Sequence, residues 1–123
     1  MQSEILLLIA CAGAGAAIGG ILRFSASKVI DCSEFPWATF VVNLIACFLA
    51  AFVTMRFGGS ISESFRVFFT VGIMGGLSTM STFANETVEM LYVGNYGYFA
   101  LNVFLNVAVC ILGAIAGREL ALI

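Results

Sequence analysis

The chain has 123 residues, of which 62% are hydrophobic and 10% charged, with a formal net charge of −2 and a mean hydropathy of +1.11. This composition excludes an ordinary soluble domain, and without a basic tract it excludes a nucleic-acid partner. The sequence contains no histidine, which rules out a histidine metal site or a serine–histidine–aspartate triad, and no other motif indicates an enzyme.

Four apolar stretches are each long enough to cross a bilayer, which takes about 20 mostly apolar residues in a helix. They predict an all-α membrane protein with one transmembrane domain over residues 1–123. The expected spans are about 5–24, 37–55, 67–93 and 98–117, joined by short connections. The first span follows a short segment without a basic region, so we expect no cleaved signal peptide.

The first span carries small residues at four-residue spacing. Such ridges let helices approach closely in lipid, so we interpret them as packing surfaces. The ridges are Gly15-x-x-x-Gly19 and Ala12-x-x-x-Ala16-x-x-x-Gly20. The span ends at Arg23, which either extends to the lipid head groups or reaches carbonyls at a neighbouring helix end.

A polar link leads to the second span, where Pro36 favours a helix start and Trp37 suits the membrane interface. Asn43 lies six residues inside this span, roughly 9 Å at the helical rise. A buried amide in lipid requires a partner. It forms either an interhelical hydrogen bond, worth about 0.6 kcal/mol on average, or an N–H donor on an anion path.

The third span contains the unusual stretch Gly72-Ile-Met-Gly-Gly-Leu-Ser-Thr-Met-Ser-Thr-Phe83. Its glycines and hydroxyls weaken a helix and predict a break near residues 75–79, at mid-membrane. Lipid tolerates a break only where protein or water satisfies the freed backbone groups. The carbonyls before such a break suit a cation, and the N–H groups after it suit an anion. The alternative is an unbroken helix with hydroxyls bonded to their own backbone.

Polar residues also recur beyond the break. Ser78, Thr82 and Glu86 follow at four-residue spacing and form one stripe of a helix. In the fourth span, Asn102 and Asn106 share a face, and Gly113-x-x-x-Gly117 is a further packing ridge. We interpret the four cysteines, Cys11, Cys32, Cys47 and Cys110, as small packing residues.

The basic residues hardly favour one orientation in the membrane. Arg56, Arg66 and Arg118 lie on the side of the termini, and Arg23 and Lys28 lie on the other. Basic residues normally decide topology, so three against two predicts insertion in both orientations. Two copies can then pair antiparallel about an axis in the membrane plane, which places shared sites near the midplane.

Three motifs together resemble the Fluc (CrcB) family of fluoride channels, over essentially all of the chain. They are Gly15-x-x-x-Gly19-x-x-x-Arg23-Phe24, Thr39-x-x-x-Asn43, and the 72–83 stretch. The resemblance implies a passive fluoride-selective channel, built as an antiparallel dual-topology homodimer with two pores. It implies a microbial plasma (inner) membrane, where the channel exports fluoride, lowers its cytoplasmic concentration and confers fluoride resistance.

The resemblance also implies roles for particular residues. A structural sodium ion is held by the main-chain carbonyls of Gly75 and Ser78, as suits a hard cation. The fluoride path includes Asn43, Met80, Ser81, Thr82, Phe83, Glu86 and, in preference to Asn102, Asn106, while Arg23 is structural. Met80 replaces the first of two phenylalanines whose ring edges face fluoride in the family. We expect conduction to survive this replacement at an altered rate.

Two other functions remain open at this point. A small dual-topology exporter of cationic drugs would have similar length, but it needs a mid-membrane carboxylate to exchange protons for substrate. No acid lies between Ile5 and Leu22, and Glu86 lies past the middle of the third span. A structural subunit without transport would explain the packing glycines but not the convergence of serine, threonine and asparagine.

Overall fold

The computed structural model describes residues 1–30 and 34–123, so Asp31 and Cys32 of the link lie outside the described residues. The described part is helical, and the segments η1 and η2 are π-helical. In chain order the elements are α1 (Gln2–Val29), α2 (Trp37–Phe57), α3 (Glu63–Arg66), η1 (Val67–Met74), α4 (Gly75–Leu77), α5 (Met80–Tyr92), α6 (Tyr96–Val103), η2 (Phe104–Val109) and α7 (Cys110–Ala121).

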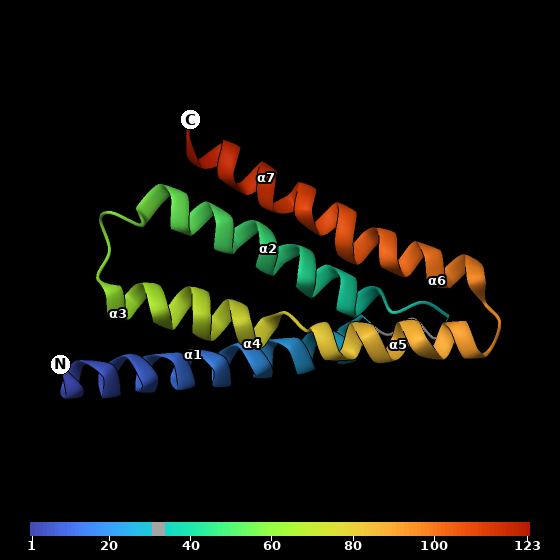
Figure 1. The fold of residues 1–123 in the computed structure, drawn as a ribbon, viewed down its shortest axis with the longest axis horizontal. Coiled ribbons are helices and arrows are strands. Elements are labelled where there is room, and N and C mark those ends of the chain that lie inside the picture. Colours follow the sequence, from blue (N-terminus) through green and yellow to red (C-terminus); the bar gives the residue numbers. More distant parts are fainter. Residues whose placement is uncertain (31–33) are drawn as a thin grey trace.

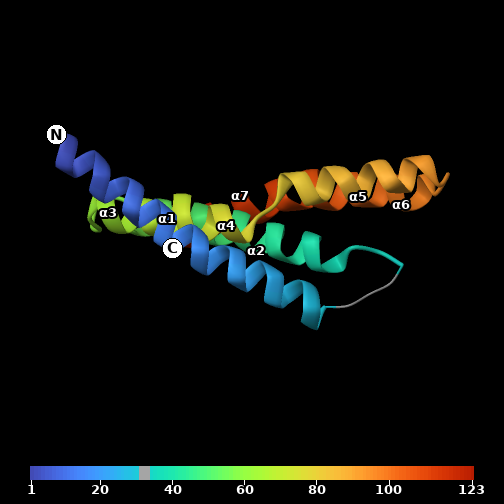
Figure 2. The same cartoon turned by 90° about the horizontal axis from the view of Figure 1, so that it is seen from below.

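These elements form four long apolar helical spans, which confirms the predicted all-α class. The spans cover Gln2–Val29, Trp37–Phe57, Glu63–Tyr92 and Tyr96–Ala121, slightly more at most ends than the sequence predicted. Both termini and the α2–α3 connection lie at one end of the bundle, and the α5–α6 turn lies at the other (Figure 1). Figure 2 shows α5 and α6 together on one side and the end of α1 on the opposite side, with α2 between them.

The predicted glycine ridges are the closest helix contacts. A Cβ atom at Gly15 would meet the backbone of Phe68 and Gly72, and one at Gly19 would meet the backbone of Ile73 and Leu77. The α1 helix therefore lies backbone to backbone against η1 and α4, which is how small residues replace the missing hydrophobic force between helices in lipid. The ridge of the fourth span packs against α2, where a Cβ at Gly117 would meet the Phe48 backbone and one at Gly113 would meet the Leu44 side chain.

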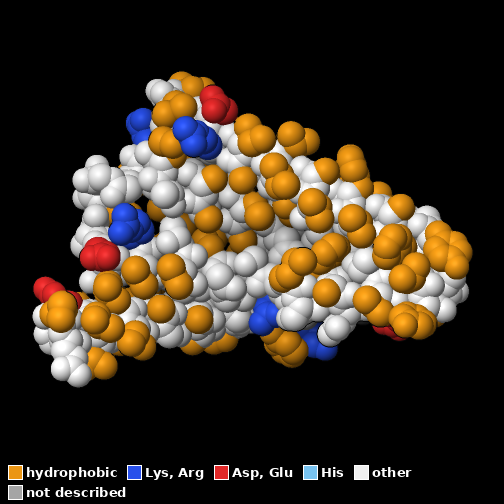
Figure 3. All heavy atoms as spheres, viewed as in Figure 1, with side chains coloured by type: hydrophobic (Ala, Val, Ile, Leu, Met, Phe, Trp, Pro, Cys, Tyr) orange, Lys and Arg blue, Asp and Glu red, His pale blue; other side chains and the backbone are white. Residues whose placement is uncertain are grey.

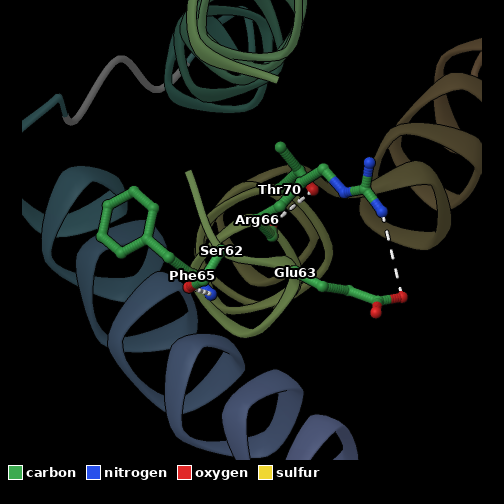
Figure 4. Close-up of polar contacts among 5 residues, drawn as sticks. All are labelled: Ser62, Glu63, Phe65, Arg66 and Thr70. Atoms are coloured by element: carbon green, nitrogen blue, oxygen red, sulfur yellow. Dashed lines mark hydrogen bonds and ion pairs between the residues drawn. The ribbon is translucent and has the colours of Figure 1, made fainter. Parts of the chain in front are cut away.

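The third span begins with a local capping arrangement (Figure 4). The Ser62 hydroxyl accepts the Phe65 N–H at 3.2 Å, as an N-cap residue does. The Thr70 hydroxyl donates to the Arg66 carbonyl at 2.7 Å, and an exposed Glu63–Arg66 ion pair spans 3.9 Å. Such a surface pair adds little stability, so the cap positions this helix start.

The outer surface of the bundle is largely apolar (Figure 3). Leu6, Ile9 and Ile21 of α1 are 63%, 62% and 67% exposed, whereas the buried core around Val42 and Met74 is small. A soluble bundle of this size would bury such side chains. Their outward position fits a bundle surrounded by lipid.

Candidate functional site

The third span leaves helical geometry at two residues. Ser78 has φ −74° and ψ 155°, Thr79 has φ −149° and ψ 111°, and α5 begins at Met80. Thr79 is the N-cap of α5, and its hydroxyl accepts the Thr82 N–H at 3.2 Å and donates to the Thr82 hydroxyl at 2.9 Å. The backbone of this stretch is therefore extended between two helical pieces.

Asn43 of α2 replaces the helical hydrogen bonds that are missing there. Its Oδ1 accepts the Thr79 N–H at 2.7 Å, and its Nδ2 donates to the Thr79 carbonyl at 3.3 Å. Nδ2 also donates to Oδ1 of Asn106 at 2.8 Å. Asn43 is 9% exposed and Thr79 is 7% exposed, so these groups satisfy one another away from solvent. One amide thus joins three of the four spans.

The same contacts free two carbonyls. In a continuous helix the Thr79 N–H would donate to the Gly75 carbonyl, and the Thr82 N–H to the Ser78 carbonyl. Here the first donates to Asn43 and the second to the Thr79 hydroxyl. The carbonyls of Gly75 and Ser78 have therefore lost these helical donors. Oxygen atoms of this kind are suitable ligands for a hard cation such as sodium.

The polar network continues from Asn106 into the fourth span. Asn106 Nδ2 donates to the Asn102 carbonyl at 3.1 Å and to Asn102 Oδ1 at 2.9 Å. Asn102, which has no exposed surface, donates to the Thr87 hydroxyl at 2.9 Å, and Thr87 donates to the Phe83 carbonyl at 2.6 Å. These uncharged groups form one hydrogen-bonded chain from α2 through η2 and α6 to α5.

A cavity of about 740 Å³ lies beside this network, lined by the end of α1, the start of α2 and the face of α5. Arg23, Glu86 and Glu89 bring charge to its wall. Thr39 donates to Oε1 of Glu86 at 2.8 Å. Nε of Arg23 and Oε2 of Glu86 are buried and have no hydrogen-bond partner among the described residues. Arg23 therefore lies in the wall of a cavity that has both apolar and charged side chains.

The predicted site residues fall into two groups. Asn43, Asn106 and Thr82 belong to the hydrogen-bonded cluster at the extended backbone, Glu86 lines the cavity, and Phe83 is 7% exposed beside Thr87. In contrast, Met80 is 74% exposed and Ser81 is also exposed, on the outside of α5. Within one chain these two residues do not join the cluster.

Three residues of the network, Thr39, Thr79 and Thr87, had no individual role in the prediction from sequence. Asn102 was the less preferred asparagine of the fourth span, yet it links Asn106 to Thr87. A signal existed for Thr79 and Thr87, since Thr79, Phe83 and Thr87 recur at four-residue spacing on one helical face. The motif Thr39-x-x-x-Asn43 likewise places Thr39 on the Asn43 face of α2.

Known proteins resemble this chain along nearly its whole length. The family model "CrcB-like protein, Camphor Resistance (CrcB)" matches residues 10–118. A protein of Elusimicrobium minutum named fluoride-specific ion channel FluC is 36% identical over 113 residues, covering 89% of each chain. FluC of Clostridium perfringens is 36% identical over 127 residues, covering 98% of this chain and 97% of its own. FluC 1 of Methanosarcina barkeri is 40% identical over 102 residues, covering 82% and 85%.

Proposed function

The chain belongs to the CrcB family, and on this premise we propose that it is a passive, fluoride-selective channel in the plasma membrane of a microbe, where it exports fluoride. The observation that carries the proposal is the Asn43 amide, which bonds the extended backbone at Thr79 and also Asn106. The relatives are named channels rather than enzymes or exporters, so the comparisons do not favour a cation exporter.

The network supports anion conduction because it offers donors without a full charge. Fluoride is strongly hydrated, so a pore must replace its water with convergent N–H and O–H groups while binding it weakly enough for release. The amides of Asn43 and Asn106 are already oriented by their hydrogen bond, and Asn43 is buried while Asn106 is half-buried. A fluoride ion that enters would accept a hydrogen bond from an amide N–H that now donates to an uncharged oxygen. Among the described residues, Asn43 forms no hydrogen bond with a lysine or an arginine.

The outward residues support a second copy of the chain. Met80 and Ser81 point out of the protomer, whereas Asn43 and Phe83 are buried within it. These residues can line a common path only if another subunit covers the outer face of α5. We therefore propose an antiparallel homodimer with two pores, in which each pore is bounded by both subunits.

Gly75 provides a test of that dimer. A Cβ atom at Gly75 would meet nothing within 4 Å among the described residues, and the Gly75 backbone is helical, at φ −63° and ψ −37°. Gly75→Leu should therefore leave the protomer folded but shift purified protein from dimer to monomer. Size-exclusion chromatography with light scattering in detergent measures the mass. Gly59→Leu in the α2–α3 loop is the matched control, and an unchanged dimer in Gly75→Leu would count against this interface.

The freed carbonyls of Gly75 and Ser78 are the groups that would hold the structural sodium ion at the dimer centre. A sodium ion there would supply positive charge to backbone oxygens that lack helical donors. Replacing sodium by N-methylglucamine should lower the thermal midpoint of the purified dimer, and restoring sodium should reverse the loss. An identical midpoint in both buffers would contradict a bound sodium ion.

Substitution of Met80 tests whether an aromatic ring edge is required on the proposed fluoride path. A phenylalanine ring edge is electropositive and attracts an anion, and methionine offers only a flexible, polarisable side chain. Because Met80 is exposed on α5, Met80→Phe should fold normally. We expect fluoride efflux from liposomes in both proteins, with the rate changed by up to about tenfold. No efflux from the natural chain together with rapid efflux from Met80→Phe would refute the prediction that methionine sustains conduction.

The proposed function itself is tested with liposomes that contain only this protein. A fluoride electrode should record rapid fluoride release when potassium counter-flow is permitted, and a chloride electrode should record none in matched vesicles. Uptake of quaternary ammonium compounds driven by a pH gradient should equal that of empty liposomes. Equal release of both halides, or gradient-driven uptake of the organic cation, would contradict a fluoride channel.

A further inference from the structure

The thiols of Cys47 and Cys110 lie side by side between α2 and α7. Asn43 and Asn106 are hydrogen-bonded at 2.8 Å, and Cys47 and Cys110 each follow four residues later, near one turn further along α2 and the π-helical end of η2. The two helices run in the same direction in Figure 1, so this register is kept. Cys110 lies between Asn106 and Gly113 on the fourth span, and Cys47 lies between Leu44 and Phe48 on α2, so the seam places the two side chains opposite each other.

The packing around the thiols fixes their approach. α7 makes its most extensive contact with α2, and Leu44 and Phe48 lie against Gly113 and Gly117 on the same seam. Cys110 is 3% exposed and Cys47 is half-buried, and neither forms a disulfide. The seam thus holds two free thiols together in an apolar setting, and neither belongs to the Asn43 network.

We propose that Cys47 and Cys110 form a two-thiolate site for a soft divalent cation that accepts two ligands, of which mercuric ion is the type. Thiolate sulfur prefers soft metal ions. Among the described residues no group of three or more histidine, cysteine, aspartate or glutamate side chains could hold a metal, so a four-ligand zinc site is excluded there. Two sulfurs alone suit an ion that prefers two-coordinate binding.

Charge balance favours a divalent ion at this place. Two S–H bonds break, two metal–sulfur bonds form, and two protons leave to water. With a divalent cation the bridged product is neutral, whereas a monovalent cation such as silver would leave a net negative charge in an apolar seam. Burying an uncompensated charge is costly, so mercuric ion should bind in preference to silver.

The position of the site predicts a consequence for transport, and this part rests on the proposed function. A metal bridge would tie α2 to α7 one turn from the Asn43–Asn106 pair. Because conduction needs these amides to release one another for fluoride, bridging should slow fluoride efflux at least about tenfold. Metal binding itself does not depend on that activity.

The test uses the full chain with Cys11→Ser and Cys32→Ser, which leaves only the proposed pair. Native mass spectrometry after addition of mercuric chloride should show one mercury per chain with the loss of two protons, and both thiols should resist maleimide. Adding Cys47→Ser or Cys110→Ser should weaken mercury retention against glutathione at least about 100-fold, since the second bond forms within one molecule. X-ray absorption should show two sulfur neighbours.

The proposal fails if one mercury protects only one thiol, if two mercury ions bind per chain, or if mercury links two chains instead of two thiols of one chain. Peptide mapping of the unmodified, mercury-loaded protein repeats the test without any substitution, and it should recover linked fragments that contain Cys47 and Cys110. A chain that binds mercury as described but transports no fluoride before its addition would overturn the proposed function and leave the metal site standing.

Discussion

Asn43→Ala should reduce fluoride efflux from liposomes at least about 100-fold. The substitution removes three hydrogen bonds, which join Asn43 to the Thr79 N–H, to the Thr79 carbonyl and to Asn106 Oδ1. A buried group that loses its partner costs about 1–3 kcal/mol of stability, so the extended backbone at Thr79 loses the groups that hold it in place. The substitution also removes a donor from the proposed fluoride path, and we expect the rate to fall for both reasons. The initial rate on a fluoride electrode, normalised to reconstituted protein, is the measurement.

Asn85→Ala is the matched control, because Asn85 is an exposed asparagine on α5 and forms no hydrogen bond with the described side chains of the network. It should retain the natural rate. Size-exclusion profiles of both variants establish that each is folded before efflux is compared. A folded Asn43→Ala protein with undiminished fluoride efflux would show that this amide is not on the conduction path.

Gly15→Val should prevent formation of the folded bundle. Its Cβ would overlap backbone atoms of Phe68, Gly72 and Ile73, which cannot move aside as the end of a side chain can. Overpacking of ordinary cores costs about 1–3 kcal/mol and sometimes more, and a backbone clash belongs at or above the upper end. We expect aggregated protein in size-exclusion chromatography and no recovery of monodisperse material.

Gly13→Val is the control in the same helix, two residues away, because a Cβ at Gly13 meets nothing within 4 Å in the protomer. It carries the same change in helix propensity and in hydrophobicity. Its recovery as a folded protein beside a lost Gly15→Val would locate the effect in the α1–η1 contact. Equal recovery of both variants would contradict the backbone packing described here.

The sequence allowed prediction of the four spans because lipid demands long apolar runs, and these are visible without tertiary information. The ridges at Gly15, Gly19, Gly113 and Gly117 were equally predictable, since only small residues at this spacing permit close helix contact. The start of α2 after Pro36 also followed from local chemistry, because proline is accepted at a helix N-terminus.

The pairing inside the site could not be derived in the same way. Asn43 bonds Thr79 and Asn106, which lie 36 and 63 residues away along the chain. Which residues of two helices face each other over such separations depends on how the whole bundle packs. Glycines and hydroxyls near 75–79 identified the region but not Thr79 as the residue that Asn43 holds. Each turn of the π-helical segment η2 contains more residues than a turn of an α-helix. The direction of the Asn106 side chain therefore differs from the direction that a 3.6-residue period predicts.

The same limit applies to the outer face of α5. The family resemblance implied that Met80, Ser81, Thr82 and Phe83 lie on one fluoride path, whereas in one protomer Met80 is exposed and Phe83 is buried. Residues that follow one another in a helix point in different directions, so a common path needs a second surface. In the proposed homodimer a second copy of the chain would supply that surface, and the sequence of one chain does not locate it.

Fluoride selectivity can be read from the reversal potential of purified protein in a planar bilayer. With a tenfold fluoride gradient, equal chloride and equal pH on both sides, we expect a reversal potential close to the fluoride equilibrium value of about 59 mV. Imposing a chloride or proton gradient in place of the fluoride gradient should leave the reversal potential near zero. A reversal potential that follows chloride or protons would contradict a neutral, fluoride-selective pathway through this bundle.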